Sequence, residues 1–299
     1  MELTKESIAE WFKKLQNDIC FSLEKLDGKS KFVEDEWERS EGGGGRSRAI
    51  QGGNLIEKGG VNFSAVSGPT PEKILQALNL SQAEFFATGV SIVLHPENPW
   101  VPIIHMNVRY FEMSNGVWWF GGGIDLTPHF VIPDKAKSFH QHLQSTCDKH
   151  SPNFYHKFKS WADDYFFVKH RNETRGIGGI FFDKLGDKEG RSKEEQWSFV
   201  KDVAETFIPA YQDAVQRLRD EKWAIEDKKW QKIRRGRYVE FNLVHDKGTK
   251  FGLDTNGRTE SILMSLPPEV NWEYSHQPTT DLQRETLASL KKGIDWINA

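Results

Sequence analysis

The chain has 299 residues, a formal net charge of −3 and a pI of about 6.4. This charge balance gives no overall basic surface for nucleic acid, and two cysteines, Cys20 and Cys147, cannot supply an iron–sulfur cluster or a thiolate zinc site. No apolar run approaches the roughly 20 residues that a membrane span needs. We therefore expect a soluble protein of a reducing compartment without a membrane span. Because we find no repeat and no long linker, we expect one domain over residues 1–299.

The N-terminal segment is predicted to be a helix, because apolar residues recur at steps of three and four from Ile8 to Leu26. Four glycines at 42–45 then precede Arg46 and Arg48. The Gly-Lys-Ser/Thr ending of a phosphate-binding P-loop is absent. This stretch suits either a plain flexible loop or a loop that closes on an anionic ligand.

Residues 87–126 favour antiparallel strands. GVSIVLHP is rich in β-branched residues, IIHMNVRYFEM alternates, and VWWFGGGIDL returns after a hairpin turn centred on Asn115 and Gly116. Alternation gives the second strand two different faces. One carries His105, Asn107 and Arg109, and the other carries Met106, Val108 and Tyr110.

Asp125 is the acid of the returning strand. Counting outward from the turn places it opposite residue 105 or 106, and a bulge in the glycine run 121–123 would turn its side chain over. In the favourable register, one face collects His105, Asn107, Arg109 and Asp125. Polar groups on a half-buried face need partners, which favours a functional site. The alternatives are a structural histidine and a plain ion pair between Arg109 and Asp125.

The second half of the chain is predicted to be mainly helical. Helices are expected near 136–147 and 155–165, after the capping box of Ser192 and Glu195 as far as Leu218, up to Gly236, and over about 280–297. RYVEFNLV and GRTESILMSLPP are predicted as strands. Hairpin strands and separate blocks of helices favour an α+β fold with a large, mainly antiparallel sheet.

Two further groups of residues have both structural and functional interpretations. His95, His105, His140 and His170 offer ligands for a metal if the fold brings them together, although no H-E-x-x-H pattern is present. Basic residues fit either a solvated helix end or recognition of a polycarboxylate. They are Arg234, Arg235, Arg237 and Arg258, with Arg46, Arg48, Arg171 and Arg175 elsewhere.

Eight long stretches carry a resemblance to a known family. In chain order over roughly 32–273 they are GGGGRSR, GVNFS, GVSIVLHPENP, HMNVRYF, WWFGGGIDLTP, DDYFFVKHRNETRGIGGIFFD, RRGRYVEFNLV and GLDTNGRTESILMSLPP. Together they resemble the oxygen-dependent coproporphyrinogen III oxidases of haem biosynthesis. An ordered series of this length is far more specific than any single motif.

The resemblance implies an activity: oxidative decarboxylation of two propionate groups of coproporphyrinogen III to vinyl groups, giving protoporphyrinogen IX, carbon dioxide and hydrogen peroxide. It implies a large antiparallel sheet with helices on both faces, molecular oxygen as co-substrate and no organic cofactor. It also implies a cytoplasmic homodimer, with an interface that includes about 238–273. A non-catalytic tetrapyrrole carrier and a metal-dependent hydrolase are the alternatives.

Residue roles carry over by position from the same resemblance. His105 corresponds to the proposed proton donor, and Arg109 with Asp125 to the pair that acts on a propionate and a pyrrole. We expect Asp125 to be an exposed acid that accepts a pyrrole proton, and Gly121, Gly122 and Gly123 to let the flat macrocycle approach the backbone. The substrate contacts carried over are Ser91, Asn107, Val108, Arg109, Asn256, Gly257 and Arg258, and the divalent-metal ligands carried over are His95, His105, His140 and His170.

The chain departs from the family pattern in a few places. His129 stands where an aromatic residue is usual, His245 where tryptophan or tyrosine is common, and Asn256 in place of a glycine. None of these positions belongs to the proposed catalytic residues.

Overall fold

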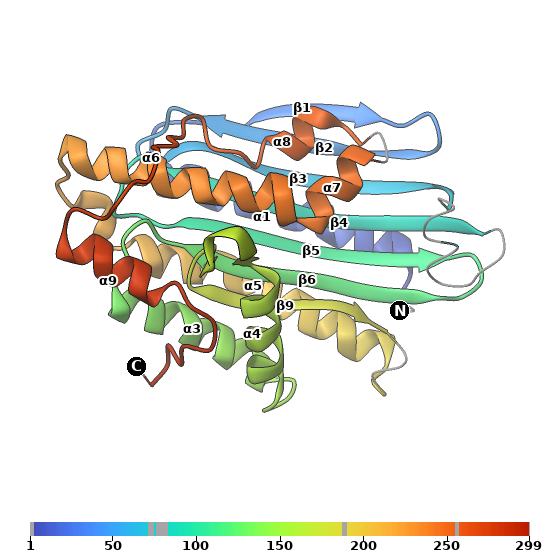
Figure 1. Cartoon of the computed structure of the whole chain (residues 1–299). Coiled ribbons are helices and arrows are strands. Elements are labelled where there is room, and N and C mark those ends of the chain that lie inside the picture. The colour runs from blue at the N-terminus through green and yellow to red at the C-terminus, as the bar shows by residue number, and fades with distance from the viewer. Residues whose placement is uncertain (1–2, 71–74, 76–82, 187–189, 255–256, 299) are drawn as a thin grey trace.

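A computed structural model describes residues 3–70, 75, 83–186, 190–254 and 257–298. Its centre is a seven-stranded antiparallel sheet in the order β1-β2-β3-β4-β5-β6-β9 (Figure 1). This architecture confirms the α+β class and the large antiparallel sheet. The strands are β1 (Val33–Glu38), β2 (Gly43–Gln51), β3 (Ile56–Pro69), β4 (Glu84–Pro96), β5 (Ile103–Met113), β6 (Trp118–Thr127) and β9 (Gly178–Leu185).

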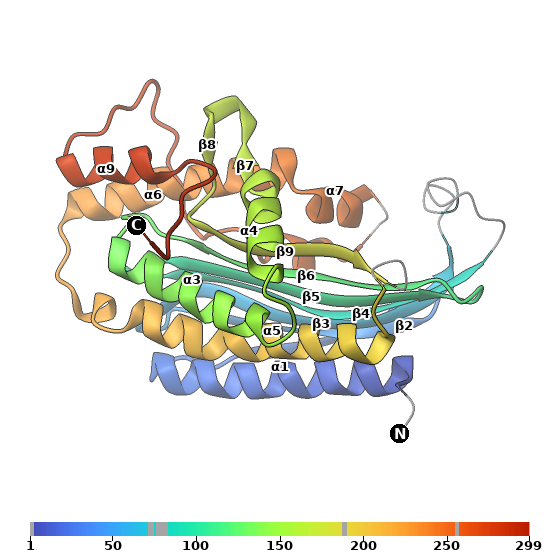
Figure 2. The same ribbon diagram turned by 90° about the horizontal axis from the view of Figure 1, so that it is seen from below.

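Helices cover both faces of this sheet, as the resemblance implies (Figure 2). One layer holds α1 (Lys5–Asp27), α3 (Pro133–Asp148) and α5 (Lys193–Val215). The opposite side holds α6 (Ile225–Glu240), the π-helix η4 (Phe241–His245) and α7 (Lys247–Asp254). Further helices in the described part of the chain include α4 (Phe154–Tyr165), which packs on β9, α8 (Thr259–Leu263) and α9 (Asp281–Ser289). Within the described ranges, no helix has the length and apolarity that crossing a membrane requires.

The main hydrophobic core lies between the sheet and the layer of α1, α3 and α5. Met106, Val108 and Tyr110 point into it from β5 and are almost fully buried. Burying one large apolar side chain contributes roughly 1.5–3 kcal/mol, so sliding β5 by one residue would be costly. The core therefore fixes which face of β5 is left for the polar side chains His105, Asn107 and Arg109.

The hairpin between β5 and β6 is confirmed. The N–H of Met113 donates to the carbonyl of Val117 at 2.8 Å, and Gly116 adopts a φ of +87°, which favours glycine. Counting from this turn, the observed register pairs His105 with Asp125. The more favourable of the two expected registers is therefore the correct one.

The glycine run at 42–45 was expected to be a loop, and that prediction is wrong for most of it. Gly43, Gly44 and Gly45 begin β2, between β1 and β3. A Cβ on Gly45 would lie 2.4 Å from the Trp37 side chain of β1, so a larger residue would displace that ring. The glycines serve close strand packing, and strands β1 to β3 around them were not predicted.

Two segments predicted as strands are not strands. RYVEFNLV forms the end of α6 and the π-helix η4, and GRTESILMSLPP forms α8 followed by an irregular segment. Gly236 does not end its helix. It lies inside α6, where the carbonyl of Asn271 would be 2.8 Å from a Cβ. Glycine there permits close packing of a distant segment, a tertiary requirement that a local pattern does not reveal.

Two helices end earlier in the structure than the sequence predicted. The helix after the capping box ends at Val215, and Leu218 belongs to a short 3₁₀ turn (Leu218–Asp220). The last helix, α9, ends at Ser289 rather than near residue 297.

Candidate active site

Strands β5 and β6 present the predicted polar face on the side of α6 and η4. The register sets His105 opposite Asp125, Asn107 opposite Gly123 and Arg109 opposite Gly121. Ser91 of β4 pairs with Asn107 on the other side. Four of the residues predicted from the sequence therefore lie on one face: Ser91, His105, Asn107 and Arg109.

Asp125 lies behind His105 in a chain of short contacts. The Nδ1 atom of His105 is 2.7 Å from Oδ1 of Asp125. One terminal nitrogen of Arg175, Nη2, donates to both Asp125 oxygens at 2.7 Å each. The Asp125 side chain is only 1% exposed, whereas that of His105 is 21% exposed. The expectation of an exposed acid at position 125 is therefore wrong.

The environment of Asp125 keeps this buried carboxyl ionised. Burial on its own would raise its pKa, but the charge of Arg175 and the hydrogen bond from His105 outweigh burial and leave the pKa below its ordinary value. An ionised carboxylate only accepts hydrogen bonds, so Nδ1 of His105 carries the hydrogen that it donates. In a neutral imidazole, Nε2 is then the bare nitrogen, and among the described residues the side-chain hydrogen bond of His105 is the one through Nδ1.

Arg175 itself is enclosed by aromatic rings. Its guanidinium carbon lies 4.3 Å from the ring centroid of Phe166, 4.6 Å from that of Tyr238 and 4.8 Å from that of Phe241. Nη1 donates to the Asn242 side chain at 3.0 Å. Burial opposes this charge, but Asp125 outweighs burial and raises the pKa of Arg175. Arg175 is thus a fixed cation beneath the polar face.

Arg109 does not pair with Asp125, contrary to the ion-pair alternative. Its Nη2 donates to Asp183 of β9 at 2.7 Å, and its Nη1 donates to the Asn107 side chain at 3.0 Å. The reason is register, because Arg109 stands opposite Gly121, four residues from Asp125 along β6. With 40% of its side chain exposed, Arg109 can still meet a ligand.

The glycines of β6 make room for the protein's own side chains. A Cβ on Gly121 would lie 2.7 Å from Asp183 and 2.8 Å from Nε of Arg109. A Cβ on Gly122, on the core face, would lie 2.9 Å from the ring of Phe182. Both glycines and Gly123 are buried. Close approach of a macrocycle to this backbone is therefore not needed to explain them.

Comparisons with known proteins identify the family. Residues 7–296 match the family described as "Coproporphyrinogen III oxidase". The chain belongs to this family. It is 45% identical over 309 aligned residues to the "Oxygen-dependent coproporphyrinogen-III oxidase" of Prochlorococcus marinus strain AS9601, with 95% of this chain and 90% of that protein covered. The proteins of the same name from strains MIT 9301 and MIT 9312 are 45% and 44% identical, with the same coverage. The resemblance seen in the sequence is confirmed.

The substrate contacts expected from the family resemblance do not all lie beside His105. The Val108 side chain is buried in the core, so only its backbone is available on the polar face. Arg258 forms an ion pair with Asp35 of the edge strand β1, and the N–H of Gly257 donates to the carbonyl of Gly252 at 2.8 Å. Asn256 lies outside the described residues.

The four histidines expected to bind a metal are not grouped as ligands, and each has its own partners. His95 is 2.8 Å from the carbonyl of Ser265, and His140 is 3.0 Å from the carbonyl of Ile177. His170 contacts His245 at 2.9 Å and Glu240 at 2.7 Å, and His105 contacts Asp125. In the ranges that the structure describes, no three His, Cys, Asp or Glu side chains are grouped to hold a metal ion. This arrangement does not fit a shared metal, and the metal stays a prediction from the resemblance.

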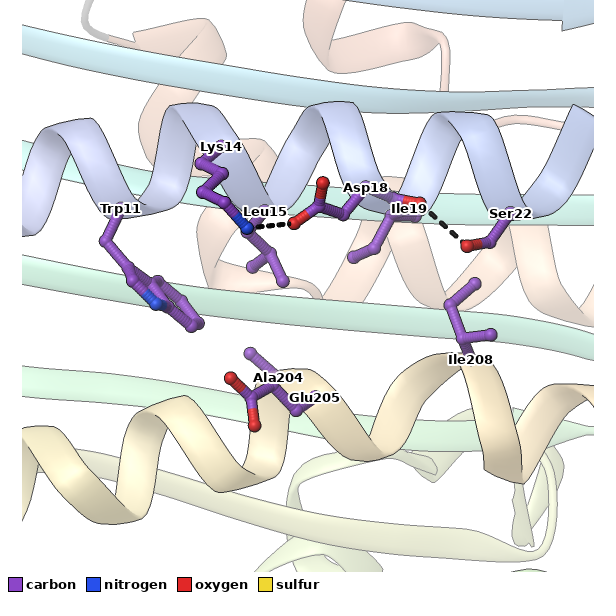
Figure 3. Close-up of a pocket in the computed structure, with 9 residues that line it drawn as sticks. All are labelled: Trp11, Lys14, Leu15, Asp18, Ile19, Ser22, Ala204, Glu205 and Ile208. Atoms are coloured by element: carbon purple, nitrogen blue, oxygen red, sulfur yellow. Dashed lines mark hydrogen bonds and ion pairs between the residues drawn. The ribbon is translucent and has the colours of Figure 1, made fainter.

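A surface groove lies away from the polar face (Figure 3). It runs between α1 and α5, whose buried residues pack on the sheet face opposite His105. Its polar features include the exposed pair of Lys14 and Asp18, 2.7 Å apart. We assign this groove no part in the chemistry, because Asp125, His105 and Arg109 are all on the other side of the sheet.

Arg175 is the site residue that sequence reasoning did not assign. It was visible only as a basic residue before the glycine-rich GIGG, and its partner Asp125 is 50 positions away. The topology that places β9 beside β6 brings the two together.

Proposed function

We propose that this chain catalyses the oxygen-dependent oxidative decarboxylation of coproporphyrinogen III and does so on the polar face of β5 and β6. Family membership over residues 7–296 supports the reaction. The observation that carries the location is the partly exposed imidazole of His105, held from behind by the buried Asp125 and standing beside Asn107 and Arg109. Molecular oxygen is the co-substrate, in keeping with the names of the relatives.

The reaction must remove a carboxylate and a hydride equivalent from each propionate. The bond to the carboxyl carbon breaks and its electrons form the vinyl double bond, which releases carbon dioxide. The carbon attached to the pyrrole ring gives up the hydride equivalent. Oxygen takes those two electrons and two protons, one of them from the medium, and becomes hydrogen peroxide. One oxygen molecule is thus reduced for each vinyl group formed.

His105 is our candidate for the proton transfer. Oxygen reacts slowly with closed-shell organic molecules, so the substrate must first become electron-rich, and loss of a pyrrole N–H proton achieves this. A neutral imidazole that keeps its hydrogen on Nδ1 and donates it in a hydrogen bond to Asp125 offers Nε2 as the base. This assignment replaces the direct role first expected for Asp125, whose carboxylate is buried.

Arg109 is our candidate for holding the reacting propionate. A guanidinium presents several donors in a plane that suits a carboxylate. In the substrate-free protein these donors bond to Asp183 and Asn107. A propionate would share or replace the contact with Asp183, while Asn107 would keep the guanidinium oriented. Arg258 and Ser91 remain proposed as further substrate contacts.

Anaerobic mixing followed by admission of oxygen tests this proposal. We expect no turnover until oxygen enters, and then one hydrogen peroxide and one carbon dioxide for each vinyl group. A tetrapyrrole carrier would bind coproporphyrinogen III and consume no oxygen. A metal-dependent hydrolase would form no peroxide and would lose its activity to chelators. Either result would contradict the proposal.

We also propose that the chain forms a cytoplasmic homodimer through the segment 238–273. Support comes from the number of large apolar side chains that this segment exposes, because exposed apolar surface commonly marks an interface. The exposed apolar residues of this segment are Leu243, Val244, Phe251, Leu253 and Trp272.

A further inference from the structure

We infer that Arg175 is a positioning residue for the proposed reaction: held by aromatic rings, it fixes the Asp125 carboxylate, and that carboxylate orients the His105 imidazole toward the substrate. The inference rests on the proposed function and adds a residue to it. Arg175 is 3% exposed, so it does not touch the substrate itself. Its influence must pass through Asp125.

Several separate elements combine to hold the Arg175 guanidinium. Phe166 follows α4, Tyr238 belongs to α6, and Phe241 and Asn242 belong to η4. All of these side chains contact the guanidinium group. The backbone N–H of Arg175 donates to the carbonyl of Phe166 at 2.8 Å. The backbone and the guanidinium group of Arg175 are thus both held by contacts that do not involve Asp125.

The contact with Asp125 transmits this fixed position to His105. Because Nη2 of Arg175 lies 2.7 Å from each carboxylate oxygen, it restricts rotation of the carboxylate. Oδ1 also accepts from Nδ1 of His105 at 2.7 Å, so the imidazole plane follows the carboxylate. The carboxylate of Asp246 also acts on the charge of Arg175, but its oxygens accept from Tyr165 and Thr249.

A purely structural ion pair explains less of this arrangement. Buried ion pairs are often no more stabilising than well-packed apolar residues, because desolvation offsets their attraction. Here the carboxylate has a second, partly exposed partner on the face that carries Asn107 and Arg109. Groups that orient a reacting histidine through a carboxylate or carbonyl typically change activity by about 10–100-fold when they are removed, a range measured for metal sites.

The test compares Arg175→Gln and Arg175→Lys in the full chain, with kinetic constants calculated per folded molecule. For Arg175→Gln we expect kcat to fall by about 10–100-fold while KM stays within about twofold. Lysine keeps the charge without the planar fork and should restore activity only in part. In ¹⁵N NMR spectra of the histidine side chains, His105 should change from a single Nδ1-protonated form to a mixture.

Arg46→Gln is the matched control. Arg46 is also a buried arginine, but it bonds to Gln16 and Asn17 of α1, on the side of the sheet away from His105. We expect its replacement to lower stability while kcat and the His105 spectrum stay as in the wild type. The comparison separates the effect of losing any buried arginine from the specific effect of losing Arg175.

A double replacement keeps the inference testable if Arg175→Gln does not fold. Asp125→Asn with Arg175→Gln removes both buried charges together. If Arg175 acts only through Asp125, the double variant is no slower than Asp125→Asn alone. A further loss of about tenfold in the double variant would contradict the inference. So would a folded Arg175→Gln with wild-type kcat, a change confined to KM, or an unaltered His105 spectrum.

Failure of the proposed function would look different. In that case the wild-type chain itself would form no vinyl product from coproporphyrinogen III. The NMR comparison needs no substrate, so it would still show whether Arg175 fixes the His105 imidazole.

Discussion

The Nδ1 atom of His105 lies 2.7 Å from Oδ1 of Asp125, with the imidazole partly exposed and the carboxylate buried. This relationship separates the roles of the two residues. The exposed ring can exchange a proton with a substrate, whereas the carboxylate sets the orientation and the tautomer of the ring.

Asp125→Asn is the prediction that follows most directly. The amide keeps the size of the side chain but can present its NH₂ group to His105 and favour the wrong tautomer. In the serine proteases, where an aspartate orients the catalytic histidine in the same way, the equivalent change costs about 10⁴ in kcat, and we expect a loss of at least about 10² here. Steady-state kinetics on folded protein measure it. Wild-type turnover would remove Asp125 from the mechanism.

Asp125→Ala tests how much the buried pair of Asp125 and Arg175 contributes to stability. The alanine leaves Arg175 buried without its carboxylate, and breaking a buried pair typically costs about 3–5 kcal/mol. We therefore expect a large drop in the free energy of unfolding, measured by denaturant titration. A variant as stable as the wild type would show that the contact between Arg175 and Asp125 contributes little to the fold.

The arginine variants should separate binding from chemistry. Truncating one partner of a buried charge pair costs roughly 2–5 kcal/mol. With a propionate bound, Arg109→Ala should lower kcat at least about tenfold, because its contact changes as the carboxylate leaves. Lysine at position 109 should restore activity only in part. Arg258→Ala, on the β1 side of the sheet, should mainly raise KM. Wild-type kinetics in both alanine variants would contradict both assignments.

The buried histidine at position 129 predicts a pH-dependent stability. Burial, and then the charge of Arg235, hold the pKa of His129 well below its ordinary value of 6.5. The folded state therefore keeps the ring neutral while the unfolded chain takes up a proton as the pH falls below about 6.5. This contribution to stability is present above a pH of about 6.5 and is lost at lower pH by up to about 1.4 kcal/mol per pH unit.

His129→Phe should remove that dependence while keeping an aromatic ring in the same space. We expect the free energy of unfolding of the wild type to fall relative to the variant between about pH 6.5 and pH 5, measured by chemical denaturation in steps of pH. His156→Gln, at an exposed histidine, is the control. Parallel pH curves for the wild type and His129→Phe would contradict the prediction.

The proposed dimer has its own test. A charge introduced in place of an exposed apolar residue costs little in a monomer but disrupts a buried interface. Val244→Glu, within 238–273, should shift the mass measured by light scattering toward that of one chain. Ile225→Glu, at an equally apolar exposed position outside that segment, should not. A wild-type protein that is already monomeric at micromolar concentration would contradict the proposed homodimer.

Chelation tests the metal. We expect activity to survive thorough treatment with a chelator, because proton removal and oxygen reduction in our scheme take place through the substrate and His105. Loss of activity that one particular metal restores would promote the four predicted histidines, His95, His105, His140 and His170, to functional ligands and would require a different arrangement from the one described.

The sequence by itself determined the family, the fold class and most of one polar face. Long motifs identify the family, and strand alternation places His105, Asn107 and Arg109 together because the period of a strand is two residues. The predicted hairpin turn at Asn115 and Gly116 left two possible residues, 105 and 106, opposite Asp125 on the neighbouring strand. The comparisons confirm the family, and the structure confirms the strand face and the hairpin, which are local properties.

Only the tertiary structure decided which side chains pair. Arg175 reaches Asp125 because β9 lies beside β6, and Arg109 reaches Asp183 for the same reason. Gly236 stays inside α6 because the chain at Asn271 packs against it. Each of these contacts joins residues at least 35 positions apart. A local sequence pattern cannot predict contacts between residues so far apart in the chain. Such pairs form only when the strands and helices pack together and bury their side chains.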